Sequence, residues 1–301
     1  MTIFKCFDLE TTSTDVATCE VVQAAIVEAP RWSDSADDPN GIGLVPSAVS
    51  ARSMLFFAAA IPAGAQAVHG ITPEKVADAP PFIRAVRSFV AMLTEPDVVS
   101  VSFNGCGYDL PIVARYMSLL QGATTGRSTA AEIEQNLRER HIDVMRLWQR
   151  TRAQRRAVAW TDSGWRRRLP LHAECFSGTL TAAHAFWLGE VFDAAHDATA
   201  DCMATLRVLD AMLRAGFVDV ETAIRWSNEP MPGDVDFAGK LKWDGGTCVV
   251  AVGKVSGTPI EDVDKGFLQW MLRADFPEDT KQIVRKFLAG EYPQRKYESE
   301  T

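Results

Sequence analysis

The sequence predicts an α/β fold followed by a small α+β module. Short apolar runs typical of buried strands alternate with segments of helical apolar spacing, which indicates a sheet covered by helices. The Pro- and Gly-containing stretch 228–233 indicates a linker, after which the pattern changes. A chain of 301 residues is also long for one hydrophobic core, so we expect two domains.

The strands of the first domain are predicted from five apolar runs. The first two are expected to pair as a hairpin, and residues 33–50 are expected to form a loop because Asp, Pro, Gly and Ser dominate them. The expected strands are 3–12, 21–27, 54–60, 98–103 and 142–147.

The helices are predicted from apolar spacing and from capping residues. Thr72 can cap a helix whose first turn contains Pro73, and Gly216 ends the strongest helical pattern. The other expected helices are 82–93, 111–120, 171–188 and 199–214. In the C-terminal module we expect strands in 239–246 and 247–252, and helices around 267–272 and 279–288.

Composition is that of an ordinary globular protein, with 47% hydrophobic and 23% charged residues. We expect neither a membrane span nor a signal peptide, because no apolar run approaches 18 residues and no charged-then-apolar leader is present. The six cysteines are scattered without a Cys-x-x-Cys pair, which favours reduced thiols in the cytoplasm.

The net charge of −8 argues against nucleic-acid binding, but positive charge is concentrated in one segment. Residues 138–168 hold ten arginines against three acidic residues. A phosphate backbone would be attracted to such a block, whereas a solvated helix face is an equally good interpretation of the charge alone.

The carboxylates of the first strand are the first candidate functional groups. Because side chains two apart on a strand share a face, Asp8 and Glu10 lie side by side and Leu9 points into the core. Two carboxylates at the end of a buried strand repel each other and resist desolvation. A divalent cation with oxygen ligands would relieve both costs, although such pairs are common on solvated loops.

Three further residues are candidates, and each also has a plain structural interpretation. Asp109 stands where a helix is expected to begin and could be an N-cap. Asp201 lies in the first turns of an apolar helix and could favour its N-terminus. His196 precedes that helix and could be an exposed loop histidine. Their joint occurrence with the first pair favours a catalytic interpretation.

Together these five residues resemble the DEDDh exonucleases, a family with a ribonuclease H-like fold. The motifs are FDLETT at 7–12, NGCGYDLP at 104–111 and HDATAD at 196–201, in the family's order and spacing. The segments 68–72 and 142–143 are similar to secondary signatures of proofreading subunits. Ser13 departs from the glycine that often follows the paired threonines.

The resemblance covers roughly residues 1–215 and implies a mixed five-stranded sheet flanked by helices. The exonuclease domain is then expected at 1–217, with an Arg-rich insert at about 148–170, a helix end and linker at 218–233, and the module at 234–301. This module resembles the C-terminal module of exonuclease X-like enzymes, except that Ser256 replaces a second basic residue. Its role is either phosphate gripping or stability and partner docking.

The resemblance implies 3′→5′ hydrolysis of DNA that releases nucleoside 5′-monophosphates, with two Mg²⁺ ions and Mn²⁺ as a substitute. It gives Asp8 the bridging position, Glu10 and Asp201 the rest of one ion site, and Asp109 the support of the other. It makes His196 the general base. The implied substrate-binding residues are Leu9, Thr11, Thr12, His69, Phe103 and Asn104.

For longer DNA we expect a grip in the Arg-rich segment, where tryptophans could stack on bases. The candidate grip residues are Arg155, Arg156, Trp160, Trp165, Arg166 and Arg167. The expected partner is DNA, with single-stranded 3′ ends, and no membrane. The alternatives are a proofreading subunit bound to a DNA polymerase, an exonuclease acting on RNA, and a catalytically silent nucleic-acid-binding scaffold.

Overall fold

The computed structural model describes residues 2–30, 42, 44, 49–121, 128–151, 177–190, 192, 196–274 and 276–294. The chain divides into two compact units, Met1–Ser227 and Asn228–Thr301. No helix within the described ranges is both long and apolar enough to cross a membrane.

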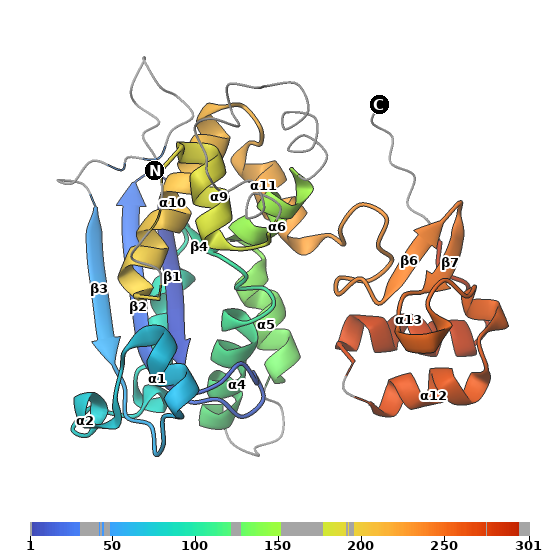
Figure 1. The fold of residues 1–301 in the computed structure, drawn as a ribbon, viewed down its shortest axis with the longest axis horizontal. Helices are drawn as coiled ribbons and strands as arrows, with labels where there is room; N and C mark the ends of the chain where they lie inside the picture. The colour runs from blue at the N-terminus through green and yellow to red at the C-terminus, as the bar shows by residue number, and fades with distance from the viewer. Residues whose placement is uncertain are drawn as a thin grey trace. The chain divides into compact units, whose positions relative to one another are not determined.

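The first unit is built on a mixed five-stranded sheet with the order β3-β2-β1-β4-β5 (Figure 1). The strands β1 and β2 form an antiparallel hairpin and β3 pairs antiparallel with β2, whereas β4 and β5 run parallel to β1. The predicted α/β fold class, a mixed five-stranded sheet flanked by helices, is therefore confirmed. The strands are β1 Ile3–Thr11, β2 Val21–Pro30, β3 Ser50–Leu55, β4 Val98–Ser102 and β5 His141–Asp143.

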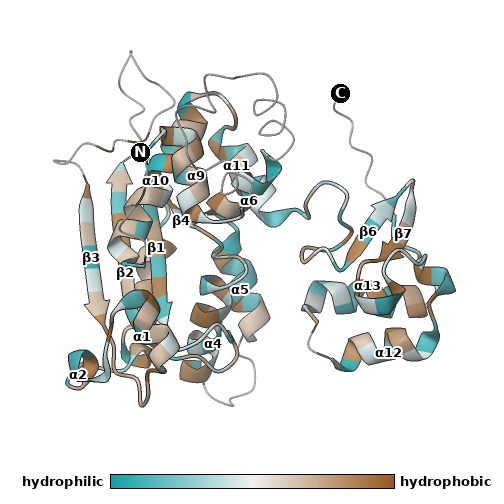
Figure 2. Ribbon diagram, viewed as in Figure 1, coloured by the Kyte–Doolittle hydropathy of each residue, from teal (hydrophilic) through white to brown (hydrophobic). Residues whose placement is uncertain are grey.

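The main core lies on one face of this sheet. Phe4 and Cys6 of β1 point to this face and belong to a cluster of buried residues that includes Cys202 and Leu206. Figure 1 shows α10 lying along β1 and β2, as its contacts with both strands require. The helices contributing to this cluster are α6 Val144–Arg150, α9 Leu180–Leu188, α10 Ala198–Arg214 and α11 Val220–Asn228. Figure 2 shows hydrophobic colour along most of α9, whose residues include buried alanines.

The opposite face packs on aromatic residues. Phe7 of β1 meets Phe89 edge-on at 5.8 Å between ring centroids, and Phe82 meets Phe89 at 5.7 Å. The elements on this side are η1 Phe82–Arg84, α3 Val86–Leu93 and α4 Asp109–Gln121. The remaining helices are α1 Ala63–His69, α2 Pro73–Val76 and α5 Ala130–Arg138, and Thr129 begins α5 with a capping box.

Two predicted strands are wrong in their extent. The expected strand 54–60 ends at Leu55, because β3 pairs with β2 only from Ser50 to Leu55. Beyond it Phe56 and Ala58 are buried, Ala58 in a satellite cluster, whereas Phe57 is exposed. The expected strand 142–147 ends at Asp143, whose carboxylate accepts a bond from the Met145 N–H and begins α6. A short apolar run cannot distinguish a buried strand from a buried helical turn.

The second unit is a small α+β structure. Its strands β6 Leu241–Asp244 and β7 Thr247–Val250 form an antiparallel hairpin. The helical elements are η3 Gly253–Val255, η4 Ile260–Asp262, α12 Lys265–Arg273 and α13 Glu278–Leu288. Leu268 and Met271 of α12 and Val284 of α13 are fully buried against the hairpin residues Leu241 and Val250.

Candidate active site

Three carboxylates meet where β1 and α10 come together. One ligand oxygen from each of Asp8, Glu10 and Asp201 lies within 4.8 Å of the others. The strand supplies the first two because they share a face, and α10 supplies the third because it packs across that face. The β1–β2 register shifts between Glu10 and Thr11, a type of irregularity that re-aims side chains at functional sites.

The turn before α10 fixes two of the predicted residues relative to each other. The backbone N–H of His196 donates to Oδ2 of Asp201 at 3.0 Å. Asp197 caps the helix by accepting bonds from the N–H groups of Thr199 and Ala200. His196 has φ 73°, a left-handed conformation uncommon for residues other than glycine, and its side chain is exposed. Asp201 is therefore held in the first turn while the imidazole faces outward.

Asp109 is a fourth carboxylate. It is the first residue of α4, which follows β4, the strand next to β1. Its side chain is 3% exposed, and its Oδ1 has no hydrogen-bond partner within the described part of the chain. Its charge raises the pKa of Asp8, so the two carboxylates interact electrostatically. A buried carboxylate oxygen without a donor is costly, and a cation would satisfy it.

A cavity of about 460 Å³ is lined by two of these four carboxylates, Asp8 and Asp201. His196, Phe103 and the start of α9 also line it. The lining residues that sequence reasoning missed are Ser177, Thr179, Leu180 and Thr181. The sequence prediction placed these residues inside a helix over 171–188, whereas Thr179 caps α9 by accepting the N–H of Ala182, and nothing in the local pattern indicated proximity to Asp8.

The pKa values of all four carboxylates are raised, and burial is the largest cause at each. The pKa of Glu10 is raised to about 9, that of Asp109 to about 8 and that of Asp201 to about 6. The pKa of Asp8 lies well above its ordinary value because burial is reinforced by the charges of Asp109 and Asp201. Four hard oxygen donors that repel one another fit divalent cations such as Mg²⁺ or Mn²⁺.

These shifts predict a metal-dependent pH effect on stability. Between about pH 6.5 and 8 the folded carboxylates bind more protons than the unfolded ones, so stability falls as pH rises when no cation is present. A decrease of about 2 kcal/mol in the free energy of unfolding lowers the melting temperature by roughly 4–8 °C in a unit of this size. Thermal unfolding with a chelator should show this decrease, and saturating Mn²⁺ should remove it.

Between about pH 6.5 and 8, neither buried histidine nor buried thiol groups contribute much to the pH dependence of stability. Burial lowers the pKa of His141 to about 3, so His141 raises stability with pH only below its unfolded value. Burial raises the pKa of thiols such as Cys106, which matters only at higher pH. A decrease of the same size in the presence of Mn²⁺ would contradict the assignment of these carboxylates to a metal site.

The side chains of the turn predicted to bind the terminal nucleotide are mostly buried and hydrogen bonded within the protein. Leu9, Thr11 and Thr12 are at most 8% exposed. The Thr11 hydroxyl is hydrogen bonded to the Tyr108 hydroxyl, and the Tyr108 hydroxyl donates to the Ser13 carbonyl. The Thr12 hydroxyl accepts the N–H of Glu20. The hydroxyls of Thr11 and Thr12 are thus engaged within the protein, and the role of these three residues in binding a substrate stays a prediction.

The other predicted substrate residues lie around the same region. His69 ends α1 and accepts the N–H of Ile71 through Nδ1. Burial lowers the pKa of His69, and the charge of His196 acts in the same direction. Phe103 lines the cavity, whereas the backbone of Asn104 is bonded to Asp143. The six predicted grip residues, 155, 156, 160 and 165–167, lie outside the described residues.

Gly105 lies in the loop that leads from β4 to Asp109, where a side chain cannot fit. A Cβ there would lie 1.9 Å from Oγ and 2.7 Å from Cβ of Ser102. The Ser102 hydroxyl is itself buried and bonded to Nε2 of His141 at 3.0 Å. Rotation of the serine would break that bond without clearing its Cβ, so the backbone would have to move.

Gly105→Ala is therefore expected to lower the free energy of unfolding by about 1–3 kcal/mol, the usual cost of overpacking. Urea denaturation measures this effect. Gly64→Ala is the matched control, because nothing lies within 4 Å of its Cβ position and alanine favours the helix α1. If both variants had the same stability as the parent, the loop would be looser than described.

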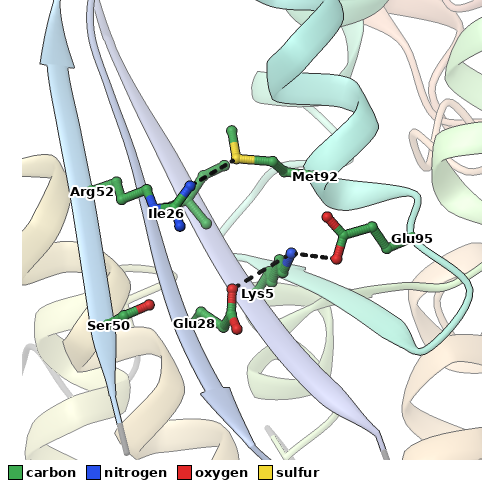
Figure 3. A pocket seen from close by; sticks show the side chains of 7 residues that line it. All are labelled: Lys5, Ile26, Glu28, Ser50, Arg52, Met92 and Glu95. Atoms are coloured by element: carbon green, nitrogen blue, oxygen red, sulfur yellow. Dashed lines mark hydrogen bonds and ion pairs between the residues drawn. The ribbon is translucent and has the colours of Figure 1, made fainter.

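A second cavity, of about 190 Å³, lies on the α3 side of the sheet (Figure 3). Lys5 of β1 is buried there between Glu95, at 2.8 Å, and Glu28, at 3.5 Å. Arg52 of β3 points at the sulfur of Met92. Because the ammonium is neutralised by two carboxylates, this cluster explains how a lysine is accommodated in a buried strand, and we assign it no chemistry.

Known structures share this fold. The chain is similar to E. coli exonuclease I in complex with a dT13 oligonucleotide, with a TM-score of 0.50 and 17% identity over 72% of this chain and 42% of that chain. It is also similar to another exonuclease I structure, with a TM-score of 0.55 and 15% identity over 93% of this chain and 61% of that chain. The chain thus spans about 40–60% of these relatives. No protein-family model and no curated protein sequence matches it. At this identity the similarity establishes the ribonuclease H-like fold of exonuclease I.

Proposed function

We propose that the protein is a metal-dependent 3′→5′ exonuclease that hydrolyses single-stranded DNA and releases nucleoside 5′-monophosphates. The observation that carries the proposal is the meeting of Asp8, Glu10 and Asp201 within 4.8 Å at the wall of a cavity that also contains His196. The fold shared with exonuclease I, one of whose structures contains a DNA oligonucleotide, supports the choice of DNA.

The four carboxylates are the residues that would hold divalent cations. Asp8 and Glu10 are fixed by the strand, Asp201 by its bond from the His196 N–H, and Asp109 by the first turn of α4. When bound, two such ions would stabilise the negative charge on the attacking and leaving oxygens of a phosphodiester. The raised pKa values of the carboxylates support this role, because the site without cations resists full ionisation.

His196 is the proposed general base. Its imidazole is exposed at the cavity, and its backbone is tied to Asp201, so the ring lies at the edge of the carboxylate cluster. Histidine takes up and releases protons readily near neutral pH, which suits removal of a proton from the attacking water. Phe103 and Leu180 provide apolar walls of the cavity, against which a terminal base could stack.

A direct assay tests this function. The full chain is incubated with 5′-labelled single-stranded DNA, duplex DNA or RNA, each with Mg²⁺, with Mn²⁺ or with a chelator. We expect a ladder of products shortened from the 3′ end of single-stranded DNA, only with the cations. A 5′-phosphorylated, internally labelled strand that yields oligonucleotides instead of mononucleotides would contradict exonucleolytic action, and preferential loss of RNA would contradict the substrate.

A further inference from the structure

Asp143, the last residue of β5, is a buried carboxylate outside the cavity. It is 1% exposed, and both of its oxygens accept bonds from the loop that follows β4. Oδ1 accepts the backbone N–H of Asn104 at 2.9 Å, and Oδ2 accepts that of Cys106 at 3.0 Å. One side chain therefore grips two peptide groups of the same loop.

Asp143 is itself held from two further directions. Oδ1 also accepts the N–H of Met145 at 3.1 Å, so the carboxylate caps α6. The backbone N–H of Asp143 donates to Oγ of Ser227 at 2.8 Å, and this hydroxyl donates to the Ala223 carbonyl within α11 at 2.7 Å. Its position is thus fixed by the ends of β5, α6 and α11, and it has little freedom to follow the loop.

The loop that is hydrogen bonded to Asp143, residues 103–108, leads directly to Asp109. Asn104 adopts the left-handed conformation at φ 70°, and the carbonyl of Gly105 accepts the N–H of Leu110 at 2.9 Å. Asp109 lies between these bonded groups, so its backbone cannot shift without breaking either the Gly105–Leu110 bond or the bonds to Asp143. Its Oδ1, which has no hydrogen-bond partner among the described residues, is consequently held at one place, and the charge of Asp109 acts on Asp8.

We propose that Asp143 is a positioning residue, which holds Asp109 where its free oxygen can meet a divalent cation. This inference rests on the proposed function for the identity of the bound group. Groups that orient a metal ligand typically change metal affinity or activity by about 10–100-fold when removed. Asp143 acts through the peptide groups of Asn104 and Cys106, and not by contact with the cation.

The test compares Asp143→Asn with the parent chain. The amide keeps the size of the carboxylate but turns an NH₂ group toward one of the two loop N–H donors. We expect Mn²⁺ to bind at least about 10-fold more weakly in calorimetric titration. We also expect faster hydrogen exchange of the amides of Asn104 and Cys106. Loss of the negative charge of Asp143 would by itself also weaken Mn²⁺ binding, so the faster exchange of these two amides, which charge removal alone does not cause, is the readout that identifies positioning.

Thr129→Ala is the matched control, since it removes the cap of α5 in the same unit without touching the loop. Unchanged or tighter Mn²⁺ binding in Asp143→Asn overturns the proposal, as does an equal loss in Thr129→Ala. If Asp143→Asn does not fold, Ser227→Ala decides by the same two readouts, because it removes the acceptor of the Asp143 N–H and the donor to the Ala223 carbonyl while it keeps the charge of Asp143. A parent chain that binds Mn²⁺ but leaves DNA intact would refute the proposed function and leave the positioning role standing.

Discussion

Asp8→Asn is expected to lower the rate of single-stranded DNA hydrolysis by about 10³-fold or more. Asp8 shares its cluster with Glu10 and Asp201 and interacts with Asp109, so it is the residue through which both proposed cations would be held. Metal stabilisation of a phosphoryl transition state is worth several kcal/mol, and each ~1.4 kcal/mol is a factor of ten in rate. Single-turnover hydrolysis of labelled DNA at saturating Mg²⁺ measures the loss.

The same variant should unfold at a higher temperature than the parent in the presence of a chelator. The pKa of Asp8 is raised by burial and by neighbouring carboxylates, so its ionisation opposes folding and the neutral amide relieves that cost. Asp15→Asn is the control, because Asp15 lies in an exposed turn and should keep the parent rate within about twofold. An Asp8→Asn rate close to that of the parent would exclude the metal-dependent mechanism.

The sequence predicted the parts of the site that depend on local geometry. Asp8 and Glu10 share a face because strand periodicity requires it, and α10 was predicted within one residue of its start because the apolar spacing of 199–214 is helical. The fold class followed from alternation of strand and helix patterns, which the five-stranded sheet confirms.

The parts that sequence reasoning missed depend on contacts between distant segments. Asp143 was expected near the start of the strand 142–147 and within a secondary signature, but nothing local indicated that its carboxylate binds peptide groups 39 and 37 residues earlier in the chain. Ser227 and Thr181 carry no local signal of their partners or of the cavity. The end of β3 was also misplaced, because the register with β2, and not apolar content, decides where a strand ends.

A substitution that removes the His196 imidazole has to preserve the left-handed backbone conformation at this position. Alanine at this position would combine loss of the imidazole with strain, because φ is 73°. Asparagine tolerates the left-handed conformation, so His196→Asn removes the proposed base while leaving the N–H that donates to Asp201. A positioned acid–base group contributes roughly 10²–10⁴-fold, and we expect kcat to fall by that factor.

Mn²⁺ titration of the same variant separates a base from a metal ligand. A base can be removed with little change in cation affinity, since Asp8, Glu10 and Asp201 remain in place. His196→Ala should lose additional stability relative to His196→Asn, which checks that the backbone conformation is the one described. If Mn²⁺ affinity and kcat fell in proportion in His196→Asn, the imidazole would be a ligand or a structural support, and the water would have to lose its proton to another group.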